Sequence, residues 1–83
     1  MVSRTMNLPG FDRITIDPAV MGGKPCIRGM RVTVGMIIGL IASGSAVAEI
    51  LNLYPYLEEG DIRAALSYAA WRSEEHEIPL RVA

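Results

Sequence analysis

The sequence predicts a mainly α domain, a helix-turn-helix (homeodomain-like) three-helix fold preceded by a short N-terminal strand and loop segment. An apolar segment over residues 33–43 stops at Gly44, a residue suited to end a helix in the left-handed conformation. A second, shorter segment stops at Tyr54-Pro55, because the residue before a proline disfavours helix. A third segment carries apolar side chains at helical spacing, which is typical of a buried stripe. The residues of this stripe are Ile62, Leu66, Ala69 and Ala70, widened by Ala65.

The strand and the loop come first along the chain. Residues 13–17 alternate polar and apolar side chains and include three successive β-branched residues, so they predict a short strand ended by Asp17-Pro18. Residues 22–29 contain too many glycines and prolines for a helix and predict a shaped loop with a turn at Arg28-Gly29. A short extended piece should follow, so strand content is expected only at residues 13–17 and 26–32.

Three helices are expected after the loop, near residues 33–43, 46–53 and 59–73. Thr33 can cap the first of them through its hydroxyl group. On the third helix, Arg63, Ser67 and Trp71 lie four residues apart and form a face beside the predicted stripe, which could contact a groove or another protein.

A chain of 83 residues supports one domain. We divide it into a mobile N-terminal arm (1–12), the folded domain (13–73) and an extended C-terminal tail (74–83). A composition of 51% apolar and 20% charged residues is that of a globular protein. One cysteine cannot form an internal disulfide, so a small domain of this kind is expected to gain stability from a dimer or a partner.

Composition also bears on location and on charged partners. The longest apolar run is too short to span a bilayer, and the lone cysteine and the absence of an apolar leader favour a cytoplasmic protein that does not enter the membrane. Residues 1–31 have a net charge of +3, and residues 32–83 have a net charge of −4. A polyanion is therefore expected to bind near the N-terminal half.

Several motifs together make the chain recognisable. It resembles the bacterial family called domain of unknown function 433 over residues 14–70. The resemblance implies a helix-turn-helix-like fold and, in many operons, a VapB-type antitoxin role beside a PIN-like ribonuclease toxin. In relatives the first helix usually carries charged residues at three positions where this chain has Gly35, Met36 and Gly39. The motifs that carry the resemblance are Ile14-Thr15-Ile16-Asp17-Pro18, Gly22-Gly23-Lys24-Pro25-Cys26-Ile27-Arg28-Gly29, Arg31-Val32, Ala42-Ser43-Gly44, Glu49-Ile50-Leu51, Tyr54-Pro55 and Asp61-Ile62-Arg63-Ala64-Ala65-Leu66-Ser67-Tyr68-Ala69.

Four basic residues are candidate nucleic-acid contacts: Lys24, Arg28 and Arg31 in the glycine-rich loop, and Arg63 on the third helix. The backbone N–H groups of such a loop can approach phosphates closely. The alternative is a structural loop in which Arg28 or Arg31 hydrogen-bonds to backbone carbonyls.

Three carboxylates stand at the start of the third helix: Glu58, Glu59 and Asp61. We interpret them as a solvated helix start that the helix dipole stabilises, not as a paired-carboxylate hydrolase site. They would also repel a DNA duplex at that helix end.

Two segments are candidate protein interfaces. The first helix is apolar nearly all round, so Met36, Gly39 and Leu40 are predicted to form a homodimer or partner surface. In the tail, Ile78, Leu80 and Arg81 are predicted to bind the ribonuclease as an extended segment, with Arg72 as a second cation for its metal-binding carboxylates. A frayed terminus is the alternative for the tail.

No catalytic, metal or cofactor site is predicted. Cys26 is interpreted as a small buried hydrophobe, and one cysteine with the lone His76 falls short of a metal-ligand set. The sequence therefore favours a protein that is not an enzyme. The family resemblance implies an antitoxin-like regulator that binds and neutralises a PIN-like ribonuclease toxin, with operator DNA as a further ligand. The alternative is a dimeric adaptor or oligomerisation module with no role in nucleic-acid binding.

Overall fold

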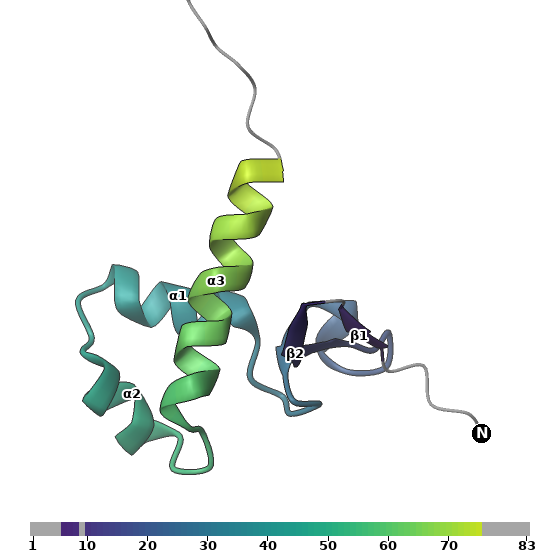
Figure 1. Cartoon of the computed structure of the whole chain (residues 1–83). Helices are drawn as coiled ribbons and strands as arrows, with labels where there is room; N and C mark the ends of the chain where they lie inside the picture. The colour runs from purple at the N-terminus through teal and green to yellow at the C-terminus, as the bar shows by residue number, and fades with distance from the viewer. Residues whose placement is uncertain (1–5, 9, 76–83) are drawn as a thin grey trace, which may run out of the picture.

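A computed structural model describes the backbone of residues 6–8 and 10–75 (Figure 1). This part of the chain is mainly helical, with a small antiparallel sheet beside the helices. No helix in it is long and apolar enough to cross a membrane. The elements are β1 (Met6–Leu8), β2 (Phe11–Ile16), the 3-10 helix η1 (Met21–Gly23), β3 (Cys26–Ile27), α1 (Val34–Ala42), α2 (Val47–Leu53) and α3 (Glu59–Glu75).

The three predicted helices are confirmed. The hydroxyl of Thr33 accepts a hydrogen bond from the Met36 N–H at 3.0 Å and so caps α1. Gly44 follows α1 with φ 101°, a conformation that glycine adopts without strain. Helix α2 ends before Pro55, and α3 continues two residues beyond the predicted end at 73.

The sheet has the strand order β1-β2-β3 and differs in part from the prediction. Strand β1 pairs with β2 within the segment where the sequence favoured a mobile arm and no strand, so the strand prediction was wrong there. The sequence pattern did not predict β1, because a strand of only three residues depends on a neighbouring strand with which it can pair. In the other direction, β3 stops at Ile27, well before the expected end at residue 32.

The predicted turn at Arg28-Gly29 is confirmed. Both residues have positive φ, 46° and 74°, and the Met30 N–H donates to the Ile27 carbonyl at 2.8 Å. Two successive residues of positive φ are the pattern of a type I′ turn, in which the non-glycine Arg28 is the unusual member. Ile14 pairs with Ile27, and the Arg28 N–H donates to the Arg13 carbonyl at 2.8 Å, so the two arginines are neighbours across β2 and the turn.

The face that α3 buries also differs from the predicted stripe. Ile62 and Ala65 are buried as expected, but Leu66 is 43% exposed and Ala70 is exposed. Tyr68 is buried instead, because α1 and β2 pack against the side of α3 that carries Asp61, Ala65 and Tyr68. The core that results is made mainly of branched aliphatic side chains from every layer: Ile14, Ile27, Val32, Val34, Ile37, Ile50, Leu57 and Ile62.

The C-terminal half of α3 projects beyond the rest of the described chain (Figure 1). Residues 70–74 are all exposed. Near the root of this projection, Phe11 of β2 packs against Tyr68 and Trp71, with ring centroids 5.5 Å from each. The aromatic contacts support the middle of α3, and the last described turns stand clear of the domain.

Candidate functional site

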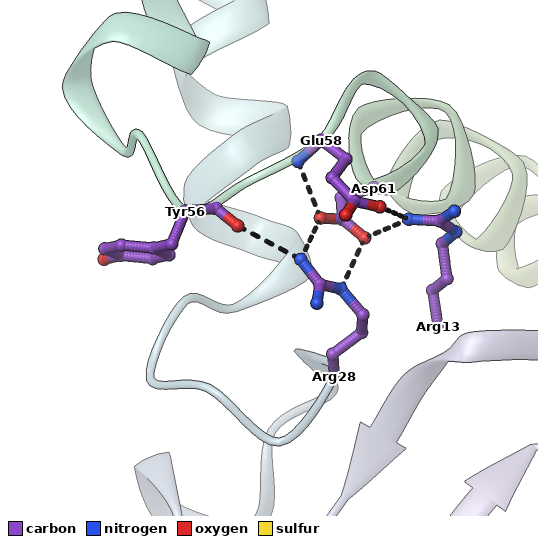
Figure 2. Close-up of polar contacts among 5 residues, drawn as sticks. All are labelled: Arg13, Arg28, Tyr56, Glu58 and Asp61. Carbon is purple, nitrogen blue, oxygen red and sulfur yellow. Dashed lines mark hydrogen bonds and ion pairs between the residues drawn. The ribbon is translucent and has the colours of Figure 1, made fainter.

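The most organised polar cluster joins the sheet to the start of α3 (Figure 2). Its centre is the fully buried carboxylate of Asp61. Arg28 donates to both oxygens of this carboxylate, from Nε at 3.0 Å and from Nη2 at 2.8 Å, and Nη2 also donates to the Tyr56 carbonyl at 3.1 Å. Arg13 Nη1 donates to Asp61 Oδ1 and to Glu58 Oε1, each at 2.8 Å. Two arginines and two carboxylates thus neutralise one another at this site.

The local sequence explains why these groups meet. Arg13 and Arg28 are cross-strand neighbours, and like charges in that relation repel unless an anion lies between them. Asp61 supplies the anion from the first turn of α3, where its Oδ2 also accepts the Glu58 N–H at 2.9 Å in the manner of a capping box. Gly60 provides the space, since a Cβ there would lie 2.8 Å from Cζ of Arg13.

The charge state of Asp61 follows from these contacts. Burial acts to raise the pKa of its carboxyl group, but hydrogen bonds from Arg28, the Glu58 N–H and Arg13 outweigh burial and lower the pKa from 3.8 to about 2. The same carboxylate raises the pKa of Arg28, and Glu58 with Asp61 raises the pKa of Arg13. Asp61 is therefore ionised at neutral pH, and removing it would leave two adjacent cations unpaired.

This cluster corrects one prediction and bears on another. The carboxylates at the start of α3 are not all solvated, because Asp61 is buried as an acceptor for two arginines. The Arg28 guanidinium binds a backbone carbonyl and a buried carboxylate, as in the structural alternative, and a nucleic-acid contact would have to compete with both.

The other three predicted nucleic-acid contacts lie on the surface and are spread over different elements. Lys24 and Arg31 are exposed in the loop, where Arg31 Nη1 lies 3.8 Å from the sulfur of Met21. Arg63 is on α3, with its side chain 74% exposed and one nitrogen 3.7 Å from a Glu59 oxygen. The structure does not gather these cations with Arg28 into one basic pocket.

The predicted partner surface on α1 is partly open. Met36 and Leu40 are half-buried, and Gly39 is exposed with no atom within 4 Å of the place that a Cβ would take. Gly35 is exposed as well. At the start of α1 there is a hollow of about 480 Å³ lined by Lys24, Pro25, Thr33, Val34, Gly35 and Met36.

The remaining predicted residues lie toward the C-terminus. Arg72 is exposed in the last turns of α3. Ile78, Leu80 and Arg81 lie outside the described residues, as does His76.

Cys26 has the surroundings of a structural thiol. Its sulfur is buried and donates to the Lys24 carbonyl at 3.3 Å, and burial raises the pKa of the thiol. Within residues 10–74, no three side chains of His, Cys, Asp or Glu come together as metal ligands.

Sequence reasoning missed Arg13, Gly60 and the burial of Asp61. A usable signal was present in Gly60, which is unfavourable inside a helix and therefore indicates a close approach by another group. Nothing local distinguishes Asp61 from the two glutamates before it.

One relative and one family match this chain. An uncharacterized protein, y4eO, of Sinorhizobium fredii (strain NBRC 101917 / NGR234) is 38% identical over 56 residues, which make up 68% of this chain and 25% of that protein. The chain thus spans about a quarter of the length of that relative. No solved structure matches the chain. Residues 14–69 match a family described as protein of unknown function (DUF433), and the chain belongs to this family.

Proposed function

We propose that this chain is a small, non-enzymatic regulatory protein of antitoxin type, which binds and neutralises a PIN-like ribonuclease. The observation that carries the proposal is the surface of α1. This helix contains no charged residue, and its two glycines are exposed with room beside them for a partner. An uncharged helix face that remains open on a small domain is suited to contact another protein.

The hollow at the start of α1 supports a partner of a particular chemistry. Its walls include Pro25, Val34 and Met36, and the exposed Lys24 lies among them. An apolar side chain of the partner can enter beside α1 while a carboxylate of the partner meets Lys24. A ribonuclease with acidic groups around its metal site offers both features.

Inhibition of a PIN-like ribonuclease in an RNA-cleavage assay tests this proposal. Met36→Glu combined with Gly39→Arg places charge on the α1 face, and we expect the variant to lose both the complex and the inhibition of RNA cleavage. Ala48→Arg combined with Asn52→Glu adds the same charges to exposed positions of α2 and is the matched control. Equal inhibition by the two variants would reject the α1 surface.

The C-terminal segment is tested in the same assay. In our proposal, removal of residues 76–83 weakens the complex, and Arg81→Ala releases ribonuclease activity more than it lowers affinity. A truncated chain that still inhibits at equal stoichiometry would show that the segment has no part in inhibition.

Operator DNA is the second proposed ligand, with α2 and α3 as a helix-turn-helix unit. Lys24, Arg31 and Arg63 would then contact phosphates, since all three are exposed. Each lost phosphate contact should lower the slope of log K against log salt by about one. Alanine variants of Arg31 and Arg63 with unchanged affinity at low salt would exclude them.

The adaptor alternative is favoured by one observation, the neutralisation of Arg13 and Arg28 inside the chain. This pairing reduces the basic surface available to a nucleic acid. An adaptor would self-associate or bind protein while showing no salt-dependent binding to DNA and no inhibition of the ribonuclease.

A further inference from the structure

One side of helix α3 is exposed to solvent in the part of the chain that the structure describes. This side lies opposite the buried positions Asp61, Ala65 and Tyr68 and carries a mixture of apolar, small and charged residues. Leu66 is 43% exposed, and Trp71 is 41% exposed although it contacts Phe11. The residues of this face, which we call the outer face of α3, are Arg63, Leu66, Ser67, Ala70, Trp71 and Glu74, all exposed.

The outer face is complementary to itself when a second copy is turned end to end. In an antiparallel pair whose twofold axis passes between residues 68 and 69, position 63 lies opposite 74, and position 67 lies opposite 70. The opposed side chains are then a cation with an anion, and two small residues that allow close approach. Leu66 and Trp71 lie at the two edges of this face. The sequence satisfies both pairings twice, as an isologous interface requires.

The shape of the domain fits the same arrangement. Two hollows flank the outer face, one of about 310 Å³ between α3 and the start of β2, and one of about 90 Å³ between α3 and α2. Arg63 lines both. The C-terminal end of α3 projects from the domain (Figure 1). The same end of a second copy, from Ala70 to Glu74, can lie along this part of the helix, with its Glu74 near Arg63.

We propose that two copies of this chain form an antiparallel dimer through the outer face of α3, with Arg63 paired to Glu74 of the other copy. The proposal is independent of ribonuclease binding, which uses α1. It places Arg63 in the dimer contact, so a dimeric chain cannot also present Arg63 to DNA. One helix face is smaller than the roughly 800 Å² per partner of a standard interface, so dimerisation depends on protein concentration.

Charge reversal tests the pairing in the full chain. Sedimentation equilibrium over a concentration series is expected to show a monomer–dimer equilibrium for the wild type. Arg63→Glu and Glu74→Arg each replace two attractions by two repulsions, and each should raise the dimer Kd about tenfold or more. The combined variant Arg63→Glu/Glu74→Arg restores opposite charges and should return the Kd to near the wild-type value.

Two further variants locate the interface. Ala70→Arg should abolish the dimer, because it puts a long cation where the helices approach most closely, and far-ultraviolet circular dichroism should show an unchanged helix content. Gly39→Arg changes the exposed α1 face and should leave the dimer intact. A monomeric wild type, a failure of the combined variant to recover, or dissociation by Gly39→Arg but not by Ala70→Arg would each overturn the proposal.

Discussion

The two ends of helix α3 differ in the burial of their charged side chains. At the N-terminal end, Asp61 is buried and accepts hydrogen bonds from two arginines of the sheet and from the helix backbone. At the C-terminal end, Glu74 is exposed on turns that project from the domain. The N-terminal end of α3 is therefore paired with the sheet, and its C-terminal end presents exposed side chains.

This difference separates residues that hold the domain together from residues that are free to bind. Around Asp61, positive and negative charges cancel within the chain, so changes there should act on folding. Along the outer face of α3 the chain leaves apolar and charged groups side by side in solvent. Changes there should act on association and leave the fold nearly unaffected.

The largest effect is expected from Asp61→Ala. Loss of the carboxylate leaves Arg13 and Arg28 as uncompensated neighbours, and breaking a buried ion pair in this way costs about 3–5 kcal/mol. Urea unfolding measures the change. Glu74→Ala is the matched control at the other end of the helix and should alter stability by less than about 0.5 kcal/mol. Similar losses of stability for the two variants would contradict the proposed difference between the two ends of α3.

Acid should weaken the anchored end selectively. The carboxyl pKa of Asp61 is about 2 in the folded chain and 3.8 as the ordinary value, so its contribution is complete well above pH 3.8 and is lost as pH falls through 3.8 toward 2. We expect this group to account for about 2–3 kcal/mol of the stability lost between about pH 5 and pH 2. Asp61→Asn should show a flatter stability profile over that range. If the stability of the Asn variant depended on pH as strongly as that of the wild type, Asp61 would not be ionised and hydrogen-bonded as described.

Gly60 and Arg13 should be coupled. Alanine at position 60 favours helix by about 1 kcal/mol, but its Cβ displaces the Arg13 guanidinium, whose Cζ would lie 2.8 Å away. Gly60→Ala should thus gain little in the wild type and stabilise an Arg13→Ala background by about 1 kcal/mol. A double-mutant cycle from denaturant unfolding measures the coupling. Equal effects in the two backgrounds would show that Gly60 is not kept open for Arg13.

A small stability effect is expected from Leu66→Ala. This side chain is 43% exposed, so at low protein concentration its truncation should cost about 0.5 kcal/mol. The matched substitution Ile62→Ala, one turn earlier and buried, should cost about 2–5 kcal/mol. Only the Leu66 variant should weaken self-association several-fold without loss of the fold. A larger loss of thermal stability for Leu66→Ala than for Ile62→Ala would instead support burial of Leu66 in the predicted stripe.

Local chemistry in the sequence determined the helices and the turn. Helix α1 begins after Thr33 and ends before Gly44 because of contacts and backbone conformations that involve only neighbouring residues. Helix α2 ends before Pro55 because the proline ring disfavours a helical conformation at the residue before it. The turn at Arg28-Gly29 has the same local origin. Such features are readable because the interacting atoms are close along the chain.

Tertiary structure alone decided which side chains are buried and paired. Glu58, Glu59 and Asp61 are equivalent acidic residues in a sequence, yet the arginines brought by β2 and the turn after β3 reach two of them and bury only Asp61. The burial of Tyr68 in place of Leu66 and the formation of β1 have the same cause. Each depends on segments distant in the chain, and a burial pattern exists only after those segments have packed.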